Sequence, residues 1–92
     1  MKYLKVKWLH DFNDEPVWLY SELDENRSET RKVEEFSNGE YGYAYEDGSK
    51  STTQLSETYL PSEDEIRSDP QFKLMVISRE EFKEVWIKAV SG

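Results

Sequence analysis

The sequence predicts an α+β domain: an antiparallel β-sheet of four to five strands, with a short acidic helix and a C-terminal amphipathic helix packed on one face. Three observations lead to this class. Apolar and polar residues alternate in residues 4–8 and again in 17–23, Asn38-Gly39 lies between two further alternating runs, and residues 78–90 repeat their apolar side chains with the period of a helix. With 92 residues, the chain is expected to form a single domain, 1–92.

The first two strands are predicted on either side of a short acidic insert. Leu4, Val6 and Trp8 alternate with lysines, as in a half-buried strand, and residues 17–23 repeat this pattern with aromatic and branched side chains. Pro16 cannot donate a ladder hydrogen bond, so we place it at the start of the second strand. The insert HDFNDE (10–15) then becomes the loop of an antiparallel hairpin.

A second hairpin is predicted at Asn38-Gly39, because these residues tolerate the positive φ values of a two-residue type I′ turn. A two-residue loop pairs Phe36 with Tyr41 and Val33 with Ala44. In this pairing Lys32 lies opposite Tyr45 and Glu34 opposite Tyr43. Charged neighbours favour solvent exposure of these two tyrosines. The alternative, held equally, is that the C-terminal helix buries the tyrosine side of the sheet. We use the name tyrosine stripe for Tyr41, Tyr43 and Tyr45.

The C-terminal half of the sequence predicts two helices, separated by residues 72–77, whose secondary structure the sequence does not decide. Residues 49–59 are rich in Ser and Thr, with a short extended piece expected around Thr53–Leu55. A capping box predicts an acidic helix that starts after Ser62 and stops before Asp69-Pro70. Residues 72–77 could form strand or helix, and we favour strand. Ser78 opens a second capping box, followed by an apolar stripe. The stripe consists of Phe82, Val85, Trp86, Ala89 and Val90.

The charge balance restricts the class of partner. Twelve Lys and Arg against twenty Asp and Glu give 12 − 20 = −8, and residues 10–30 alone hold seven acids and one base. Such a chain repels a phosphate backbone and attracts a cationic partner, so nucleic-acid binding is not expected. A solvated acidic face is the simpler alternative. The chain has no cysteine and no long apolar run, from which we expect a cytoplasmic protein that does not enter a membrane.

The insert also holds a group of residues that suggests metal or acid–base chemistry, whereas turn chemistry and helix capping account for the carboxylate clusters at 24–27 and 62–65. His10 stands beside Asp11, Asp14 and Glu15, which are residue types that bind metals or carry protons. One histidine without cysteine is a poor zinc site, and a calcium loop needs more ligands and a glycine at its turn. A solvated hairpin loop is therefore the preferred interpretation. With no nucleophile–base pair and no Gly-rich phosphate loop, we expect neither an enzyme nor a cofactor.

The order of motifs resembles a known family. WLHDF, DEPVWLYSELDENR, ETRKVE and a C-terminal EEF–VW pattern resemble an uncharacterised family of small bacterial domains of about this length, from Lys2 to Lys88. Some members of that family look like candidate immunity proteins of polymorphic toxin systems. The resemblance implies no catalytic residue.

Together these observations predict a small acidic protein-binding module. Its most specific form is a cytoplasmic immunity protein that neutralises a basic, nuclease-type toxin, as a monomer or weak homodimer. The alternatives are a housekeeping or regulatory adaptor and, less favoured, a metal-dependent protein that uses His10. The expected partner-binding residues are acids and aromatics: Asp11, Asp14, Glu15, Trp18, Tyr20, Asp24, Glu25, Tyr41, Tyr43 and Tyr45.

Overall fold

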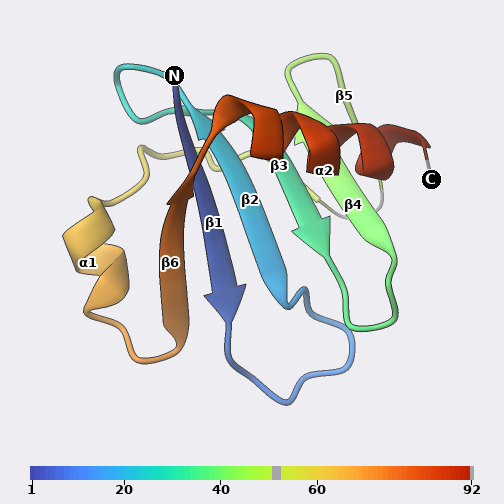
Figure 1. Ribbon diagram of the computed structural model, residues 1–92, viewed down its shortest axis with the longest axis horizontal. Helices are drawn as coiled ribbons and strands as arrows, with labels where there is room; N and C mark the ends of the chain where they lie inside the picture. The colour runs from blue at the N-terminus through green and yellow to red at the C-terminus, as the bar shows by residue number, and fades with distance from the viewer. Residues whose placement is uncertain (51–52, 92) are drawn as a thin grey trace.

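The structure is a computed structural model that describes residues 1–50 and 53–91. Its centre is one antiparallel sheet of six strands in the order β5-β4-β3-β2-β1-β6 (Figure 1). The strands are β1 (Lys2–Trp8), β2 (Trp18–Leu23), β3 (Glu29–Glu35), β4 (Tyr41–Tyr45), β5 (Gly48–Lys50) and β6 (Phe72–Ile77), and the helices are α1 (Glu63–Arg67) and α2 (Arg79–Ser91). The α+β class and the single antiparallel sheet are confirmed, but the expected count of four to five strands is too low.

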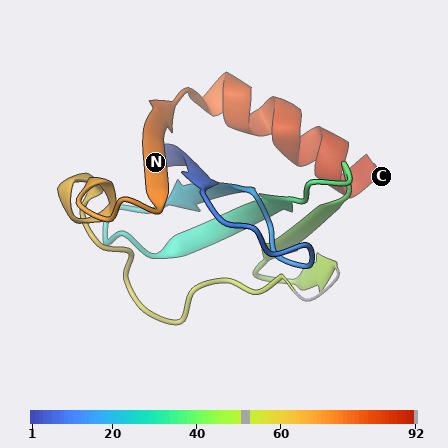
Figure 2. The ribbon, with the colours of Figure 1, turned by 90° about the horizontal axis from the view of Figure 1, so that it is seen from below.

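The chain covers the two faces of the sheet with different elements (Figure 2). Strands β1 to β5 follow one another across the sheet, and β6 adds to the free side of β1. Helix α2 then crosses back over one face toward β4, while residues 53–62, which we call the strap, pass beneath the other face toward α1. Helix α1 lies beside β6. None of the helices in the described ranges is long and apolar enough to span a membrane.

The main core lies between α2 and the sheet. Phe82, Val85 and Ala89 of the predicted stripe are buried there, and Trp86 is half-buried, whereas Val90 at the end of the helix is exposed. The strands contribute Tyr3, Tyr20 and Val33 to the same cluster. An apolar stripe of this width is what attaches an amphipathic helix to a sheet.

Both predicted serine caps form, and at α2 the reciprocal bond of the capping box also forms, from the Ser78 amide to Glu81 Oε1 (3.4 Å). The Glu65 amide donates to Ser62 Oγ (3.2 Å) at the start of α1, and the Glu81 amide donates to Ser78 Oγ (3.1 Å) at the start of α2. Residues 72–77 are a strand, as favoured, because they pair antiparallel with β1 from Trp8↔Phe72 to Tyr3↔Ile77.

The predicted register of the second hairpin is wrong by one residue. Val33 pairs with Tyr43 and Glu35 with Tyr41, and the Phe36 amide donates to Glu40 O (2.9 Å), which leaves a three-residue loop. Gly39 alone has a positive φ in this loop (87°), so the loop is a type I turn followed by a glycine bulge and not a type I′ turn.

This register decides where the tyrosine stripe lies, because a slip of one residue exchanges the two faces of a strand. The stripe shares its face with Val33 and lies under α2. Tyr41 and Tyr43 are half-buried against the core, while Tyr45 at the end of β4 is 40% exposed. The expectation that Lys32 and Glu34 mark a solvent-facing side is therefore wrong, since they project from the other face.

The charged residues of that other face hold the strap in place. Buried Thr53 donates to Glu34 Oε1 (2.6 Å), and the Ser56 amide donates to Glu29 Oε1 (2.8 Å). Gly42 makes this approach possible, because a Cβ at residue 42 would collide with the Thr53 hydroxyl. Residues 53–55, where the sequence predicts a short extended piece, are not part of a strand; the additional strand is β5, directly after the Glu46-Asp47 turn.

Candidate functional site

The acidic insert is a loop fixed by its own histidine. In the loop between β1 and β2, residues 9–17, which we call the acidic loop, the His10 Nε2–H donates to Pro16 O (2.7 Å). His10 Nδ1 accepts the Phe12 amide (2.9 Å), which assigns the Nε2–H tautomer to the neutral ring. The ring also packs edge-on against Trp8 (4.4 Å between centroids) and stacks with Phe12 (5.4 Å). Both ring nitrogens are thus engaged inside the loop, and the one free lone pair, on Nδ1, accepts the Phe12 amide.

The carboxylates of the acidic loop face solvent. Asp11, Asp14 and Glu15 are all exposed, and among the described residues none of them forms an ion pair. Phe12 lies between them in the sequence and is 61% exposed despite its size. The loop therefore presents three exposed carboxylates without ion-pair partners in the described residues, together with one exposed apolar ring.

The other predicted acids lie at the opposite end of the sheet. Asp24 and Glu25 follow β2 whereas the acidic loop precedes it, so the length of the strand separates the two groups (Figure 1). Asp24 is occupied in the turn, where its Oδ1 accepts the amides of Asn26 and Ser28 (both 2.9 Å). The predicted acids thus form two separate groups and not one continuous surface.

The predicted aromatic residues mostly serve the core. Tyr20 is buried, its hydroxyl donates to Glu35 Oε1 (3.2 Å), and burial raises the pKa of that hydroxyl. Trp18 is half-buried, with the ammonium of Lys5 4.4 Å from its ring centroid. Tyr45 is the one exposed member of the tyrosine stripe, and it contacts Trp86 edge-on.

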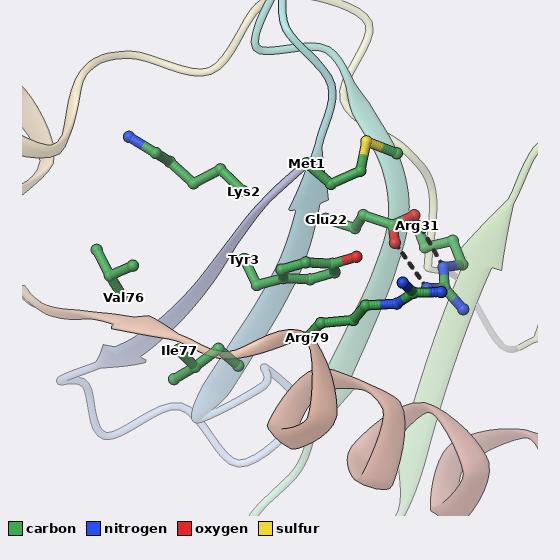
Figure 3. Close-up of a pocket in the computed structure, with 8 residues that line it drawn as sticks. All are labelled: Met1, Lys2, Tyr3, Glu22, Arg31, Val76, Ile77 and Arg79. Atoms are coloured by element: carbon green, nitrogen blue, oxygen red, sulfur yellow. Dashed lines mark hydrogen bonds and ion pairs between the residues drawn. The ribbon is translucent and has the colours of Figure 1, made fainter.

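A second site lies at the other end of β1, in an open pocket of about 690 Å³ (Figure 3). We call it the arginine pocket. It is lined by Met1, Lys2, Tyr3, Glu22, Arg31, Val76, Ile77 and Arg79. Its polar centre forms because Tyr3 pairs with Glu22 across β1 and β2, and Glu22 with Arg31 across β2 and β3, so that three side chains form one row. Arg79 joins them from the first turn of α2.

At the centre of this row, Glu22 and Arg31 form an ion pair with two hydrogen bonds. Arg31 donates from Nε (2.9 Å) and Nη2 (2.6 Å) to the two oxygens of Glu22, whose side chain is 8% exposed, and Thr30 Oγ1 donates to the same carboxylate (2.8 Å). These bonds hold the pKa of the Glu22 carboxyl below its usual value. Burial, together with the neighbouring Glu22, raises the pKa of Tyr3. The Arg31 guanidinium also lies 5.0 Å from the ring centroids of Phe82 and Trp86, which fixes its position.

A third hollow, of about 420 Å³, lies between the strap and the sheet. Val6, Leu19 and Phe72 form apolar walls, and the buried Glu29 carboxylate at its inner end accepts from Ser21 Oγ (2.6 Å). The Glu29 carboxylate is fully bonded within the fold, so this hollow belongs to the attachment of the strap.

Within the described ranges, no three histidine or acidic side chains converge in a geometry that could hold a metal ion. The sequence analysis missed the arginine pocket, because its lining comes from four strands and a helix and only the strand register brings these residues together. Phe12 did leave a signal, since Trp8, His10 and Phe12 continue the two-residue period of β1 into the loop.

Comparison with known proteins identifies a family. A family model described as "Domain of unknown function (DUF6881)" matches residues 2–91. Neither the curated proteins nor the solved structures gave a match.

Proposed function

Because this chain belongs to the DUF6881 family, whose description assigns no activity, we propose its function from its own geometry. It is a protein-binding module that uses the acidic loop to bind a basic protein partner. In its most specific form, the module is an immunity protein that covers the cationic substrate groove of a nuclease-type toxin. The observation that carries the proposal is the set of exposed, uncompensated carboxylates at Asp11, Asp14 and Glu15 on a loop with a fixed conformation.

The fixed conformation of the loop matters for affinity. A mobile loop loses conformational entropy when a partner orders it, which weakens binding. Here the two hydrogen bonds of His10 and its packing against Trp8 order the loop beforehand. The carboxylates can therefore meet a cationic surface with a smaller entropic loss.

The exposed ring of Phe12 complements the charges. Charged groups at an interface mainly accelerate association and select the partner, whereas buried aromatic anchors supply much of the binding free energy. Phe12 is 61% exposed and stands between Asp11 and Asp14 in the sequence of the same loop. The proposed contact surface is therefore Asp11, Phe12, Asp14 and Glu15, which leaves out buried Tyr20 and the core members of the tyrosine stripe.

A charge-reversal experiment tests the proposal. The triple variant Asp11→Lys/Asp14→Lys/Glu15→Lys changes the net charge from −8 to −8 + 6 = −2. The matched control, Glu46→Lys/Asp47→Lys/Glu57→Lys, reverses three other exposed acids by the same amount, away from the acidic loop. Binding to the protein encoded by the adjacent upstream gene is measured by surface plasmon resonance at low and high salt. We expect the loop variant, but not the control, to lose association rate, and the wild-type rate to fall steeply as salt increases.

The same pair of variants separates the specific forms of the proposal. If the module is an immunity protein, co-expression should protect cells from the upstream protein, and only the loop variant should fail to protect. Binding without protection would indicate the regulatory adaptor. Equal binding by both triple variants, or a rate that does not depend on salt, would refute the role of the acidic loop.

A further inference from the structure

The arginine pocket is lined by two arginines, of which only Arg31 is bonded to the Glu22 carboxylate. Arg31 is held rigidly by its two hydrogen bonds to Glu22 and by the rings of Phe82 and Trp86 beneath it. The side chain of Arg79 extends from the start of α2 toward the Arg31 guanidinium and the Tyr3 hydroxyl (Figure 3). In the part of the chain that the structure describes, Arg79 forms no ion pair.

This arrangement is electrostatically incomplete. The Glu22 carboxylate is occupied by Arg31 and Thr30, so it offers Arg79 little compensation. Lys2 also lines the pocket, but it points away from the arginines and donates to Glu63 (2.8 Å). Arg31, Arg79 and Glu22 sum to +1 + 1 − 1 = +1 at the centre of the pocket, in a protein whose net charge is −8. The Arg79 guanidinium therefore has no bonded counter-ion among the described residues, and its positive charge attracts an anion that enters the pocket.

We propose that the arginine pocket binds a carboxylate that is attached to an apolar group. A carboxylate carries one negative charge, which balances the local surplus of +1. A phosphate monoester carries about −1.5 to −2 near pH 7 and would leave an excess of negative charge beside Glu22. Guanidinium groups also match the planar, two-oxygen geometry of a carboxylate. The remaining walls are apolar side chains, Met1, Val76 and Ile77, of which Met1 and Val76 are 70% and 56% exposed.

Two sources could supply this chemistry, a free carboxylic acid or the C-terminus of a polypeptide that ends in an apolar residue. Hexanoate represents the first source and N-acetyl-Gly-Leu the second. Hexanamide and N-acetyl-Gly-Leu-amide are the matched neutral probes, and inorganic phosphate tests the choice of anion. Each probe is titrated to roughly 20 mM into ¹⁵N-labelled protein, far enough to detect a Kd in the millimolar range. The amide signals of Tyr3, Ile77 and Arg79 serve as reporters.

The variants separate this pocket from non-specific attraction. Arg79→Gln removes the unpaired guanidinium at an exposed position, so the fold should persist, whereas Arg79→Lys keeps the charge but not the two-pronged geometry. Arg67→Gln is the control, because Arg67 is also exposed, forms only a surface pair with Asp64 (3.9 Å), and its loss changes the net charge equally. We expect saturable shifts with the carboxylates, at least about tenfold weaker in Arg79→Gln, intermediate in Arg79→Lys and unchanged in Arg67→Gln.

Every other pattern of results overturns the assignment. No saturable shift with either carboxylate, equal binding of the neutral amides, or equal losses in Arg79→Gln and Arg67→Gln would show that the pocket does not select a carboxylate. Tighter binding of phosphate would replace the proposed ligand class with phosphate. If the carboxylate is bound, the stronger of the two carboxylate probes identifies the source.

Discussion

Removing the charge of Glu22 should destabilise the fold by about 2 kcal/mol. Glu22→Gln keeps the shape of the side chain but leaves Arg31 without a counter-ion. Breaking a fully buried ion pair costs roughly 3–5 kcal/mol, and a surface pair contributes at most about 1 kcal/mol. This pair lies between those limits, because the Glu22 side chain is 8% exposed while that of Arg31 remains 30% exposed and can be rehydrated. For a domain of this size, about 2 kcal/mol lowers Tm by roughly 8–16 °C.

The free energy that Glu22 contributes to folding should also change with pH, and the direction of this change can be checked. Because the ion pair lowers the pKa of Glu22 in the folded state, the unfolded chain takes up a proton at a higher pH than the folded chain does. The stability that Glu22 contributes is therefore complete above its usual pKa of 4.5 and is lost as pH falls through the lower folded-state value. Urea unfolding should show the largest difference between wild type and Glu22→Gln at pH 7, and the difference should shrink steadily below pH 4.5.

A double-mutant cycle isolates the pair from other effects. Arg31→Met keeps an apolar stem over Phe82 and Trp86, and the cycle with Glu22→Gln should give a coupling free energy of about 1–3 kcal/mol. Glu25→Gln, at an exposed position in the next turn, is the control and should change stability by less than about 0.5 kcal/mol. A difference below that size for Glu22→Gln at pH 7, or one that does not change between pH 7 and pH 3, would refute the reasoning.

Three further substitutions test local features by urea unfolding. Gly42→Ala should cost about 1–3 kcal/mol because its Cβ collides with Thr53, and Thr53→Ala in the same chain should recover part of that loss; additive losses would contradict the contact. His10→Phe keeps a ring against Trp8 but removes both loop hydrogen bonds, so we expect a loss of about 1–2 kcal/mol and faster hydrogen exchange near the loop, and unchanged exchange would show that the loop is ordered by other contacts. Ser78→Ala removes the cap of α2 and should cost about 1 kcal/mol, while Ser78→Asp should restore stability.

Local sequence patterns were sufficient for most elements. Helix α2 was predictable because its capping box at Ser78 and its apolar stripe give the same answer, and both bonds of that capping box form. Strand β5 was not predictable, since Gly48–Lys50 is a three-residue polar segment with no apolar period. It becomes a strand only because the Glu46-Asp47 turn returns the chain alongside β4.

The register of β3 against β4 shows where local reasoning is insufficient. Asn38-Gly39 is compatible with a two-residue type I′ turn and with a three-residue loop that ends in a left-handed glycine. The two loops differ by one residue, and that difference exchanges the faces of β4. The observed register places Val33 and Tyr43 together under α2, where both can lose apolar surface to water. Tertiary burial is consistent with the longer loop, and no feature of residues 36–41 alone reveals it.

The two candidate sites also differ in how far the sequence alone predicts them. The acidic loop is contiguous in sequence, so its charges could be predicted. Its internal hydrogen bonds could not, because the sequence does not show that the His10 ring bonds to Pro16 O and to the Phe12 amide. The arginine pocket joins Tyr3, Glu22, Arg31 and Arg79, which are far apart in sequence. Their proximity depends on three strand registers and on the direction in which α2 leaves β6.

The two proposed sites should operate independently, because strand β1 separates them. Seven residues of strand span about 20 Å, whereas the Debye length at 0.15 M salt is about 8 Å, so charges on the acidic loop are largely screened at the arginine pocket. The reversal of Asp11, Asp14 and Glu15 should therefore leave hexanoate binding within about twofold of wild type at this salt concentration, and Arg79→Gln should leave the association rate of the protein partner unchanged. At 0.01 M salt the Debye length grows to about 30 Å, and the loop reversal should then strengthen carboxylate binding measurably. A loss of both activities in either variant at 0.15 M salt, with folding intact by circular dichroism, would mean that one partner contacts both ends of the sheet.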